Sequence, residues 1–350
     1  MKIGKRLFSI LFFILFLSFG VLLILKPEIC KKSVASSIIL CSTVIIPSLF
    51  PFGVCALYFA KSGVFEKLNF LSPLTLKIFG LSAYPFFIFI SSLIGGYPIG
   101  AKLLSEAVKD GYLTPKSAQK MIRFCVNAGP AFIISAVGIG ILGNKLLGFM
   151  LFVSHLLSAF LICRFSGTIK IKPTKIGTLI TPVDNFVLSS SQTATAVLNI
   201  CSFVILFSVF TGYIEYYSSQ IPILKNLIYF MEVTTAITKT DNIYLISFLL
   251  GFSNLCIWAQ VLALGKNIGI NVLNFAFFRI LHGTLSSILT FVLLKIFPVS
   301  TITISTTFSF ASKPYVSSKT LSLSLLVLGI VFIISLSNRQ KSGKILEELI

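Results

Sequence analysis

A stretch rich in glycine and proline interrupts an apolar segment of the chain and could bind an anion. It covers residues 95–102 and reads GGYPIGAK. Glycine lets the backbone turn and lets a ligand approach closely, and proline presets the start of a new half-helix. That start presents free N–H groups and the positive end of a helix dipole, which favour a negatively charged group. The residues that we expect at this site are Gly95, Gly96, Tyr97, Pro98 and Lys102.

Lys102 follows the break within about one helical turn. An ammonium group at the centre of a membrane costs about 2.5–3.5 kcal/mol on insertion scales, so it should face a partner or a wet cavity. We therefore expect Lys102 to bind carboxylates of a substrate. The alternative is a side chain that extends to the membrane interface.

A second apolar segment, 243–265, is interrupted at 251–254, where the sequence reads GFSN. Asn254 lies at this break, and Trp258 and Gln260 follow on its second arm. A broken helix at membrane depth survives only where it lines a cavity or is covered by protein. We expect Asn254 and Gln260 to contribute to the same site.

A third candidate is the segment 118–142, which carries Arg123 and then the sequence Asn-Ala-Gly-Pro at 127–130. A Gly-Pro step breaks the hydrogen-bond ladder of a helix and frees carbonyl groups. The amide of Asn127 can both donate and accept hydrogen bonds. Arg123, Asn127 and Gly129 are therefore candidate site residues, and the alternative is a proline kink that serves packing.

Arg279 and His282 lie three residues apart on the segment 272–296, and so on neighbouring faces of a helix. A guanidinium can hold a carboxylate by two parallel hydrogen bonds, so we expect Arg279 to be a second carboxylate clamp. The alternative is an anchor at the membrane interface. His282 and His155 could each carry protons, and the alternative for each is a buried residue whose hydrogen bonds are satisfied in the core.

Glu232 lies in a segment, 223–237, that is too short and too polar to be a clear membrane span. A carboxylate inside a membrane points to a coupling site or a ligand for a cation. The alternative is a residue that caps a surface helix.

The charged residues expected inside the membrane favour an anionic substrate. The cations Lys102, Arg123 and Arg279 outnumber the carboxylates Glu106 and Glu232. A cavity with this balance of charge prefers an anion. The many Phe and Tyr residues would suit a flat or aromatic body.

Several other kinds of site are not expected. The seven cysteines are scattered without a C-x-x-C pair, and the chain has two histidines, so we predict no metal site. We also find no paired acid and base and no nucleophile with an adjacent base. The sequence therefore predicts a protein that is not an enzyme and that carries no cofactor.

Composition indicates what must position these residues. Of 350 residues, 56% are hydrophobic and 11% are charged, less than half the roughly 25% charged residues of a soluble domain. The apolar runs are continuous, which favours a helical membrane protein over a barrel of alternating strands. The net charge of +19 fits lysine-rich cytoplasmic loops better than nucleic-acid binding.

The chain is therefore expected to be an all-α polytopic membrane protein with about 7–9 transmembrane helices, each needing roughly 20 apolar residues. Lys2, Lys5 and Arg6 precede the first apolar run, which indicates an uncleaved span with a cytoplasmic N-terminus. The candidate spans are 7–25, 34–59, 80–106, 118–142, 146–164, 194–217, 243–265, 272–296 and 320–336.

The interrupted segments 80–106 and 243–265 are expected to be re-entrant hairpins. If 80–106 crossed the membrane, the basic residues of 164–175 would lie outside, and the positive-inside rule disfavours this. The same count places the basic tail outside, and a span hidden in 223–237 would move it inside. Both arrangements stay open.

A shift of 158 residues aligns the two interrupted segments and their surroundings, so Gly95-Gly96 falls on Ser253-Asn254. Three full crossings in each half would give the halves opposite orientations, as in transporters built from inverted repeats. We expect an anchor (1–33), a first repeat (34–176), a cytoplasmic linker (177–193), a second repeat (194–336) and a basic tail (337–350).

Five motifs together resemble the YlbJ (SpoVV) family of sporulation integral membrane proteins, and more broadly the nucleoside-recognition or Gate domain proteins. They are PSLFPF at 47–52, GGYPIGAK at 95–102, NAGP at 127–130, GFSNLCIWAQV at 251–261 and RILHG at 279–283. The resemblance implies a multi-pass protein of the outer forespore membrane in an endospore-forming bacterium. It also implies a role in spore cortex formation and, as substrate, dipicolinic acid, a small aromatic dicarboxylate that leaves the mother cell.

The expected function is thus a sporulation transporter with a small anionic substrate and the lipid bilayer as its partners. Two alternatives are a non-transporting assembly factor for the spore cortex and a nucleoside-type transporter. An assembly factor would need large exposed domains, and no loop exceeds about 30 residues. Association into a homo-oligomer stays open.

Overall fold

The computed structural model describes residues 2–171 and 181–299, and the regular secondary structure of this part is helical apart from one isolated bridge between Leu81 and Ile169. The elements of the first half are α1 (Lys2–Leu25), α2 (Pro27–Leu40), η1 (Cys41–Ile45), α3 (Ile46–Lys61), α4 (Val64–Lys67), η2 (Leu68–Leu71), α5 (Ser72–Phe79), α6 (Ala83–Gly95), α7 (Tyr97–Lys109), α8 (Pro115–Met121), η3 (Ala131–Ile141) and α9 (Lys145–Phe165). Those of the second half are α10 (Pro182–Ser218), η4 (Pro222–Leu227), α11 (Ile228–Met231), α12 (Val233–Thr238), α13 (Ile243–Phe252), α14 (Asn254–Leu264) and α15 (Val272–Ile296).

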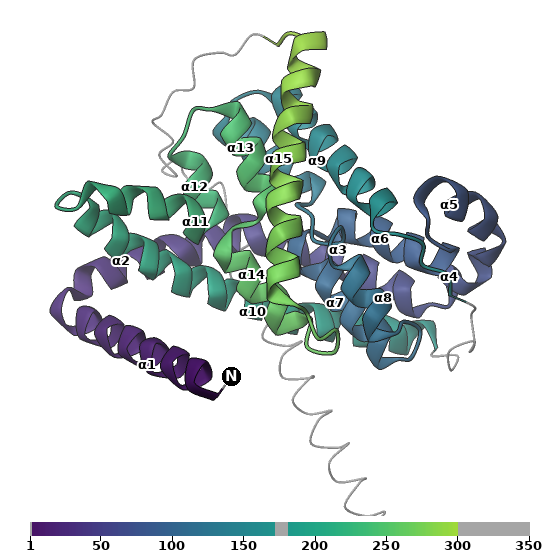
Figure 1. The fold of residues 1–350 in the computed structure, drawn as a ribbon, viewed down its shortest axis with the longest axis horizontal. Helices are drawn as coiled ribbons and strands as arrows, with labels where there is room; N and C mark the ends of the chain where they lie inside the picture. The colour runs from purple at the N-terminus through teal and green to yellow at the C-terminus, as the bar shows by residue number, and fades with distance from the viewer. Residues whose placement is uncertain (1, 172–180, 300–350) are drawn as a thin grey trace, which may run out of the picture.

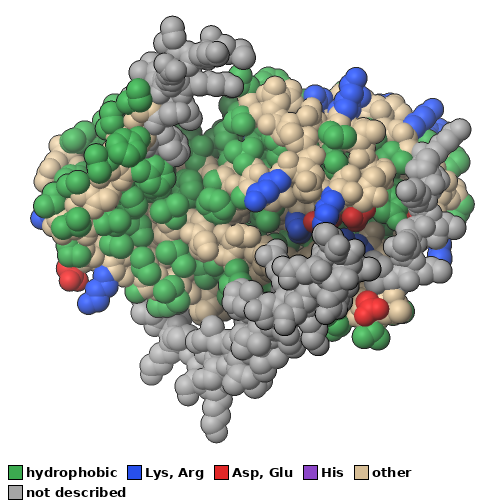
Figure 2. All heavy atoms as spheres, turned by 90° about the horizontal axis from the view of Figure 1, so that it is seen from below, with side chains coloured by type: hydrophobic (Ala, Val, Ile, Leu, Met, Phe, Trp, Pro, Cys, Tyr) green, Lys and Arg blue, Asp and Glu red, His purple; other side chains and the backbone are tan. Residues whose placement is uncertain are grey.

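The chain is an all-α polytopic membrane protein. Five of the described helical stretches are long and apolar enough to cross a bilayer: Pro27–Lys61, Lys145–Phe165, Pro182–Ser218, Ile243–Leu264 and Val272–Ile296. Apolar side chains cover broad areas of the surface, as Figure 2 shows for one face. Lipid can solvate such a surface, whereas water cannot do so without a large hydrophobic penalty.

The stretch Pro27–Lys61 is one long helix whose middle is widened into the π-helical turn η1. Pro47 is the second residue of α3, which follows this turn, and Pro51 lies inside α3. Proline cannot donate to the carbonyl four residues earlier and its ring collides with that carbonyl, so the helix must open next to it.

This long helix packs against α10 in the opposite direction. Ser208 donates to the carbonyl of Ser33 at one end of the pair, and Asn185 donates to the carbonyl of Tyr58 at the other end. The two helices occupy matching positions under the 158-residue shift. Their opposite directions are what an inverted relationship between the halves requires.

The first interrupted segment, α6 with α7, turns back on itself as expected. A Cβ atom added to Gly100 on α7 would lie 2.9 Å from the Cβ of Ser92 on α6. The rings of Tyr84 and Tyr112, at the open end of the hairpin, stack with their centroids 5.0 Å apart. Each arm has 13 residues, or about 20 Å, which is too short to cross the roughly 30 Å apolar core of a bilayer.

The second interrupted segment, α13 with α14, differs from the expected hairpin. Tyr244 contacts Phe291, Ser247 contacts Ser286 and Thr290, and the Trp258 ring contacts Phe275. These contacts run along α15 in reverse order, so α13 and α14 follow one another beside it as a bent crossing (Figure 1). The close contact between Gly251 and Gly283 keeps α13 against α15 and directs the chain onward.

The structure departs from two further expectations and decides one question that the sequence left open. The segment 118–142 is not one helix, because the chain is non-helical between α8 and η3. The segment 223–237 holds the short helices η4, α11 and α12, so it contains no span. Helix α10 begins at Pro182, inside the expected linker. The candidate span 320–336 and the basic tail lie outside the described residues.

Candidate substrate pocket

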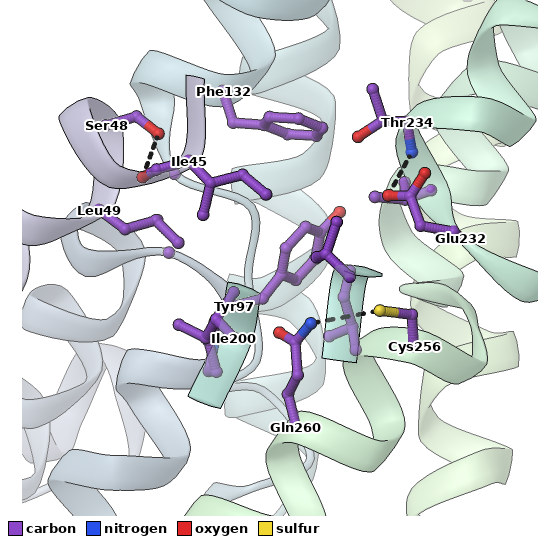
Figure 3. Close-up of a pocket in the computed structure, with 16 residues that line it drawn as sticks. Ile45, Ser48, Leu49, Tyr97, Phe132, Ile200, Glu232, Thr234, Cys256 and Gln260 are labelled. Carbon is purple, nitrogen blue, oxygen red and sulfur yellow. Dashed lines mark hydrogen bonds between the residues drawn. The ribbon is translucent and has the colours of Figure 1, made fainter. Parts of the chain in front are cut away.

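A pocket lies where several interruptions of the helices meet. Its empty volume is about 530 Å³, counting the part that opens to the exterior. The residues that line it are Ile45, Ser48, Leu49, Gly96, Tyr97, Pro98, Gly129, Phe132, Ile200, Val204, Glu232, Val233, Thr234, Cys256, Ile257 and Gln260. They come from η1, α3, α7, η3, α10, α12 and α14 and from the non-helical residues between these elements (Figure 3).

The tip of the first hairpin forms one wall. Gly96 has a φ of +85°, a conformation that glycine adopts without strain, and a Cβ atom there would meet the side chain of Leu49 at 2.8 Å. Tyr97 begins α7 and donates from its hydroxyl to the carbonyl of Leu250 at 2.6 Å. This bond joins the tip of the first hairpin to α13, just before the second break.

The second break forms the opposite wall. Ser253 and Asn254 both have positive φ angles, which ends α13 and starts α14. Cys256, Ile257 and Gln260 then face the pocket from the first turns of α14. Asn254 itself is fully buried behind the pocket and donates to the carbonyl of Tyr229.

Glu232 supplies the carboxylate of the pocket. It lies between α11 and α12, and its side chain is 4% exposed. Its oxygens accept hydrogen bonds from the backbone N–H groups of Thr234 and Thr235, at 2.9 and 2.7 Å, and from the Thr235 hydroxyl at 3.0 Å. Glu232 therefore caps α12, as in the alternative interpretation of the sequence, although this helix is buried against the pocket and does not lie at the surface.

The non-helical segment between α8 and η3 reaches the pocket through Gly129. A Cβ atom at Gly129 would lie 3.3 Å from the carbonyl oxygen of Ile94, so glycine permits this segment to touch the hairpin tip. Asn127 is fully buried, and its amide donates to the carbonyl of Phe124 at 2.7 Å. The N–H of Ala128 donates to Nε2 of His155 at 3.0 Å.

Arg279 supports the same segment from α15. Its side chain is fully buried, and its two terminal nitrogens donate to the carbonyls of Arg123 and Val126. The freed carbonyls of an unwound segment need donors, and a guanidinium presents several in a fixed geometry. In this conformation Arg279 holds the backbone, in place of the carboxylate that we expected it to clamp.

The two histidines lie behind the pocket in contact with each other. Their ring centroids are 4.4 Å apart, and both side chains are fully buried. Nε2 of His282 lies 3.1 Å from the carbonyl oxygen of His155, so it carries the proton and donates. His155 and His282 therefore help to hold the non-helical segment between α8 and η3 in place.

The other predicted cations lie away from the pocket. Lys102 pairs with Glu106 at 2.8 Å, and Glu106 also pairs with Lys61 at 3.2 Å. Arg123 donates to the side chain of Asn274 at 3.1 Å and lies over the ring of Phe278. Gly95, another predicted site residue, is also not among the residues that line the pocket, and it packs under Ile99 within the hairpin.

The pocket therefore combines one carboxylate with N-terminal residues of α7, α12 and α14, and Glu232 itself caps α12. No lysine or arginine is among the described residues that line it. Helix N-termini favour an anion, whereas the carboxylate of Glu232 opposes one. The predicted excess of cations over carboxylates therefore does not hold for the described residues that line the pocket.

Several lining residues escaped the sequence analysis. The two prolines at 47 and 51 signalled an opening near Ser48 and Leu49, because proline interrupts the helix there. Phe132, Ile200 and Val204 carry no such signal, because a pocket-facing apolar residue looks like any other apolar residue of a membrane helix.

The chain is similar to one curated protein, the sporulation integral membrane protein YlbJ of Bacillus subtilis (strain 168). The two are 23% identical over 309 residues, which cover 72% of this chain and 74% of the relative. This match confirms the resemblance drawn from the motifs, and it supports a membrane role in sporulation. No protein-family model matches the chain, and no solved structure is significantly similar to it.

Proposed function

We propose that the chain is a sporulation membrane transporter that moves a small aromatic dicarboxylate, dipicolinic acid, out of the mother cell across the outer forespore membrane. Transport of this acid would serve spore cortex formation. The proposal describes a carrier with a binding site near the middle of the membrane, and it assigns no catalytic step to the chain.

The meeting of the two helix breaks in one pocket carries this proposal. Discontinuous helices that meet at the midplane are the usual way in which secondary transporters build a substrate site. The N-termini of α7 and α14 at the pocket would bind carboxylate groups, and the rings of Tyr97 and Phe132 would contact a flat substrate (Figure 3).

The lining of the pocket also favours a second candidate, a nucleoside-type transporter. Glu232, Gln260 and Tyr97 offer hydrogen bonds to a neutral polar solute, and no basic side chain among the described lining residues would hold an anion. At an effective dielectric constant of 20, two like charges 5 Å apart repel by about 3 kcal/mol. A neutral solute would avoid this repulsion from Glu232.

Transport into proteoliposomes that hold the purified full-length chain tests both candidates. Labelled dipicolinate should accumulate above the level of protein-free vesicles, and unlabelled dipicolinate should compete with it. Labelled nucleosides added to the same vesicles should not accumulate. Accumulation of nucleosides without dipicolinate would replace the first candidate by the second, and accumulation of neither would contradict both.

A further inference from the structure

Glu232 poses an electrostatic problem for the transport proposed above. Its carboxylate is nearly fully buried, faces a pocket proposed to hold a dicarboxylate, and makes no ion pair with any described residue. Buried charges are normally paired with an opposite charge or bind a cation. Charge repulsion opposes the entry of an anion beside this carboxylate, and a positive charge that entered with the anion would remove this repulsion.

The surroundings of Glu232 supply no such charge. The ionisable side chains on which the charge of Glu232 acts are Cys41 of η1, Tyr97 of α7 and Cys256 of α14. All three are acids that are neutral near pH 7. The buried cation Arg279 is occupied by the carbonyls of Arg123 and Val126.

The carboxylate also keeps room for a ligand. An ionised carboxylate has about four acceptor positions, and the N–H and hydroxyl donors of Thr234 and Thr235 account for three hydrogen bonds. The hydroxyl of Thr234 and the side-chain oxygens of Tyr97 and Gln260 belong to the same pocket (Figure 3). Hard oxygen atoms of this kind are the ligands that hard cations prefer.

We infer that Glu232 is the coupling site of the transporter, where a monovalent cation, either Na⁺ or a proton, binds together with the anionic substrate. This inference rests on the proposed function. The cation neutralises Glu232, which removes the repulsion toward the substrate, and the substrate in turn strengthens cation binding because such coupling is reciprocal. Cation and anion then cross the membrane together.

Capping of α12 alone does not account for a glutamate at this position. A cap needs only an acceptor for N–H groups, and neutral Ser, Thr or Asn caps as well as a carboxylate does. The charge is therefore the feature to test, and the Glu232→Gln variant removes it while keeping one amide oxygen, which can accept the hydrogen bonds made to one of the two carboxylate oxygens.

The test measures uptake of labelled dipicolinate into proteoliposomes under three conditions: an inward Na⁺ gradient at equal pH, an inward proton gradient without Na⁺, and no gradient. One of the two gradients should raise uptake by the wild-type chain about tenfold. In the Glu232→Gln variant the same gradient should change uptake less than twofold, while dipicolinate still binds without it.

Two control variants separate charge from folding. Glu215→Gln removes a carboxylate whose side chain is 51% exposed and which is paired with Lys239, and its gradient response should match that of the wild type. Glu232→Asp should keep the response at a higher cation concentration.

A measurement on the wild type covers the case in which Glu232→Gln does not fold. Thermal unfolding in detergent should occur at a higher temperature in NaCl than in choline chloride, or at pH 5 than at pH 7, because a ligand of the native state stabilises it. A wild type that responds to neither the two gradients nor these additions overturns the coupling role, as does a Glu232→Gln variant with the wild-type gradient response. A wild type that transports no dicarboxylate overturns the proposed function itself.

Discussion

At the first break the arms α6 and α7 lie against each other, whereas at the second break α13 and α14 follow one another along α15. Both breaks face the same pocket, and the Tyr97 hydroxyl links them through the carbonyl of Leu250. The first break therefore inserts a short hairpin from one side, and the second bends a helix that continues across.

Close packing of small residues explains the difference. Gly100 lets α7 approach both Ser92 on α6 and the carbonyl of Cys125, so the first segment closes on itself. Gly251 instead lets α13 approach Gly283 on α15, so the second segment closes on its neighbour. A break permits a change of direction, and the contacts available on either side of it decide which direction the chain takes.

The largest expected effect is that of Gly100→Ala, which should open the hairpin. The added Cβ atom would lie 1.8 Å from the carbonyl oxygen of Cys125, and neither backbone can move without disturbing the core. We expect a loss of about 4 kcal/mol or more in the free energy of unfolding, or no folded protein. Thermal unfolding in detergent measures it.

Gly20→Ala is the matched control for this prediction, because no atom lies within 4 Å of the Cβ that it would add. It should unfold like the wild type. A Gly100→Ala variant as stable as Gly20→Ala would show that α6 and α7 do not pack as described.

Arg279→Met should remove the hydrogen bonds between α15 and the non-helical segment that follows α8. Removing the guanidinium leaves the carbonyls of Arg123 and Val126 buried without these donors, at about 1–3 kcal/mol for each unsatisfied group. We expect about 3 kcal/mol of lost stability and a similar loss in Arg279→Lys, which cannot reproduce the planar fork.

The control for this change is Arg123→Met, since that side chain is partly exposed and bonds to Asn274 at 3.1 Å. It should lose no more than about 1 kcal/mol. Equal losses in the two variants would contradict the structural role of Arg279.

Tyr97→Phe should weaken the link between the two breaks without removing either. The variant loses one buried hydrogen bond to Leu250, and we expect about 1 kcal/mol of lost stability together with slower dipicolinate uptake. Tyr244→Phe, on the partly exposed start of α13, should change neither. Normal uptake by Tyr97→Phe would mean that the link between the breaks does not matter for transport.

The smallest expected effect is that of Lys102→Ala, which tests whether a residue on the arm of the first hairpin takes part in substrate binding together with the residues at its tip. Because the ammonium pairs with Glu106 outside the pocket, uptake should stay within twofold of wild type and stability within about 1 kcal/mol. A loss of uptake of tenfold or more, in a folded variant, would instead support the role in substrate binding predicted from the sequence.

The local interruptions were within reach of sequence reasoning, whereas the partners of the polar residues were not. Gly96, Pro98 and the Gly-Pro step at 129–130 can be recognised in the sequence. Glycine tolerates backbone conformations that other residues avoid, and proline lacks the N–H group that a helix needs. Lys102, Arg123 and Arg279 looked equivalent as intramembrane cations, and each turned out to have a different partner, a carboxylate, an amide and two carbonyls.

By itself the sequence determined that the chain is a helical membrane protein with interrupted segments, because lipid leaves the backbone no other way to satisfy its hydrogen bonds, and glycine and proline mark where a helix fails. Only the tertiary structure decided that one interruption turns back and the other continues, and that Glu232 faces the pocket while Lys102 and Arg279 do not. Those outcomes depend on contacts between helices far apart in the chain, and no local pattern encodes which surfaces will meet.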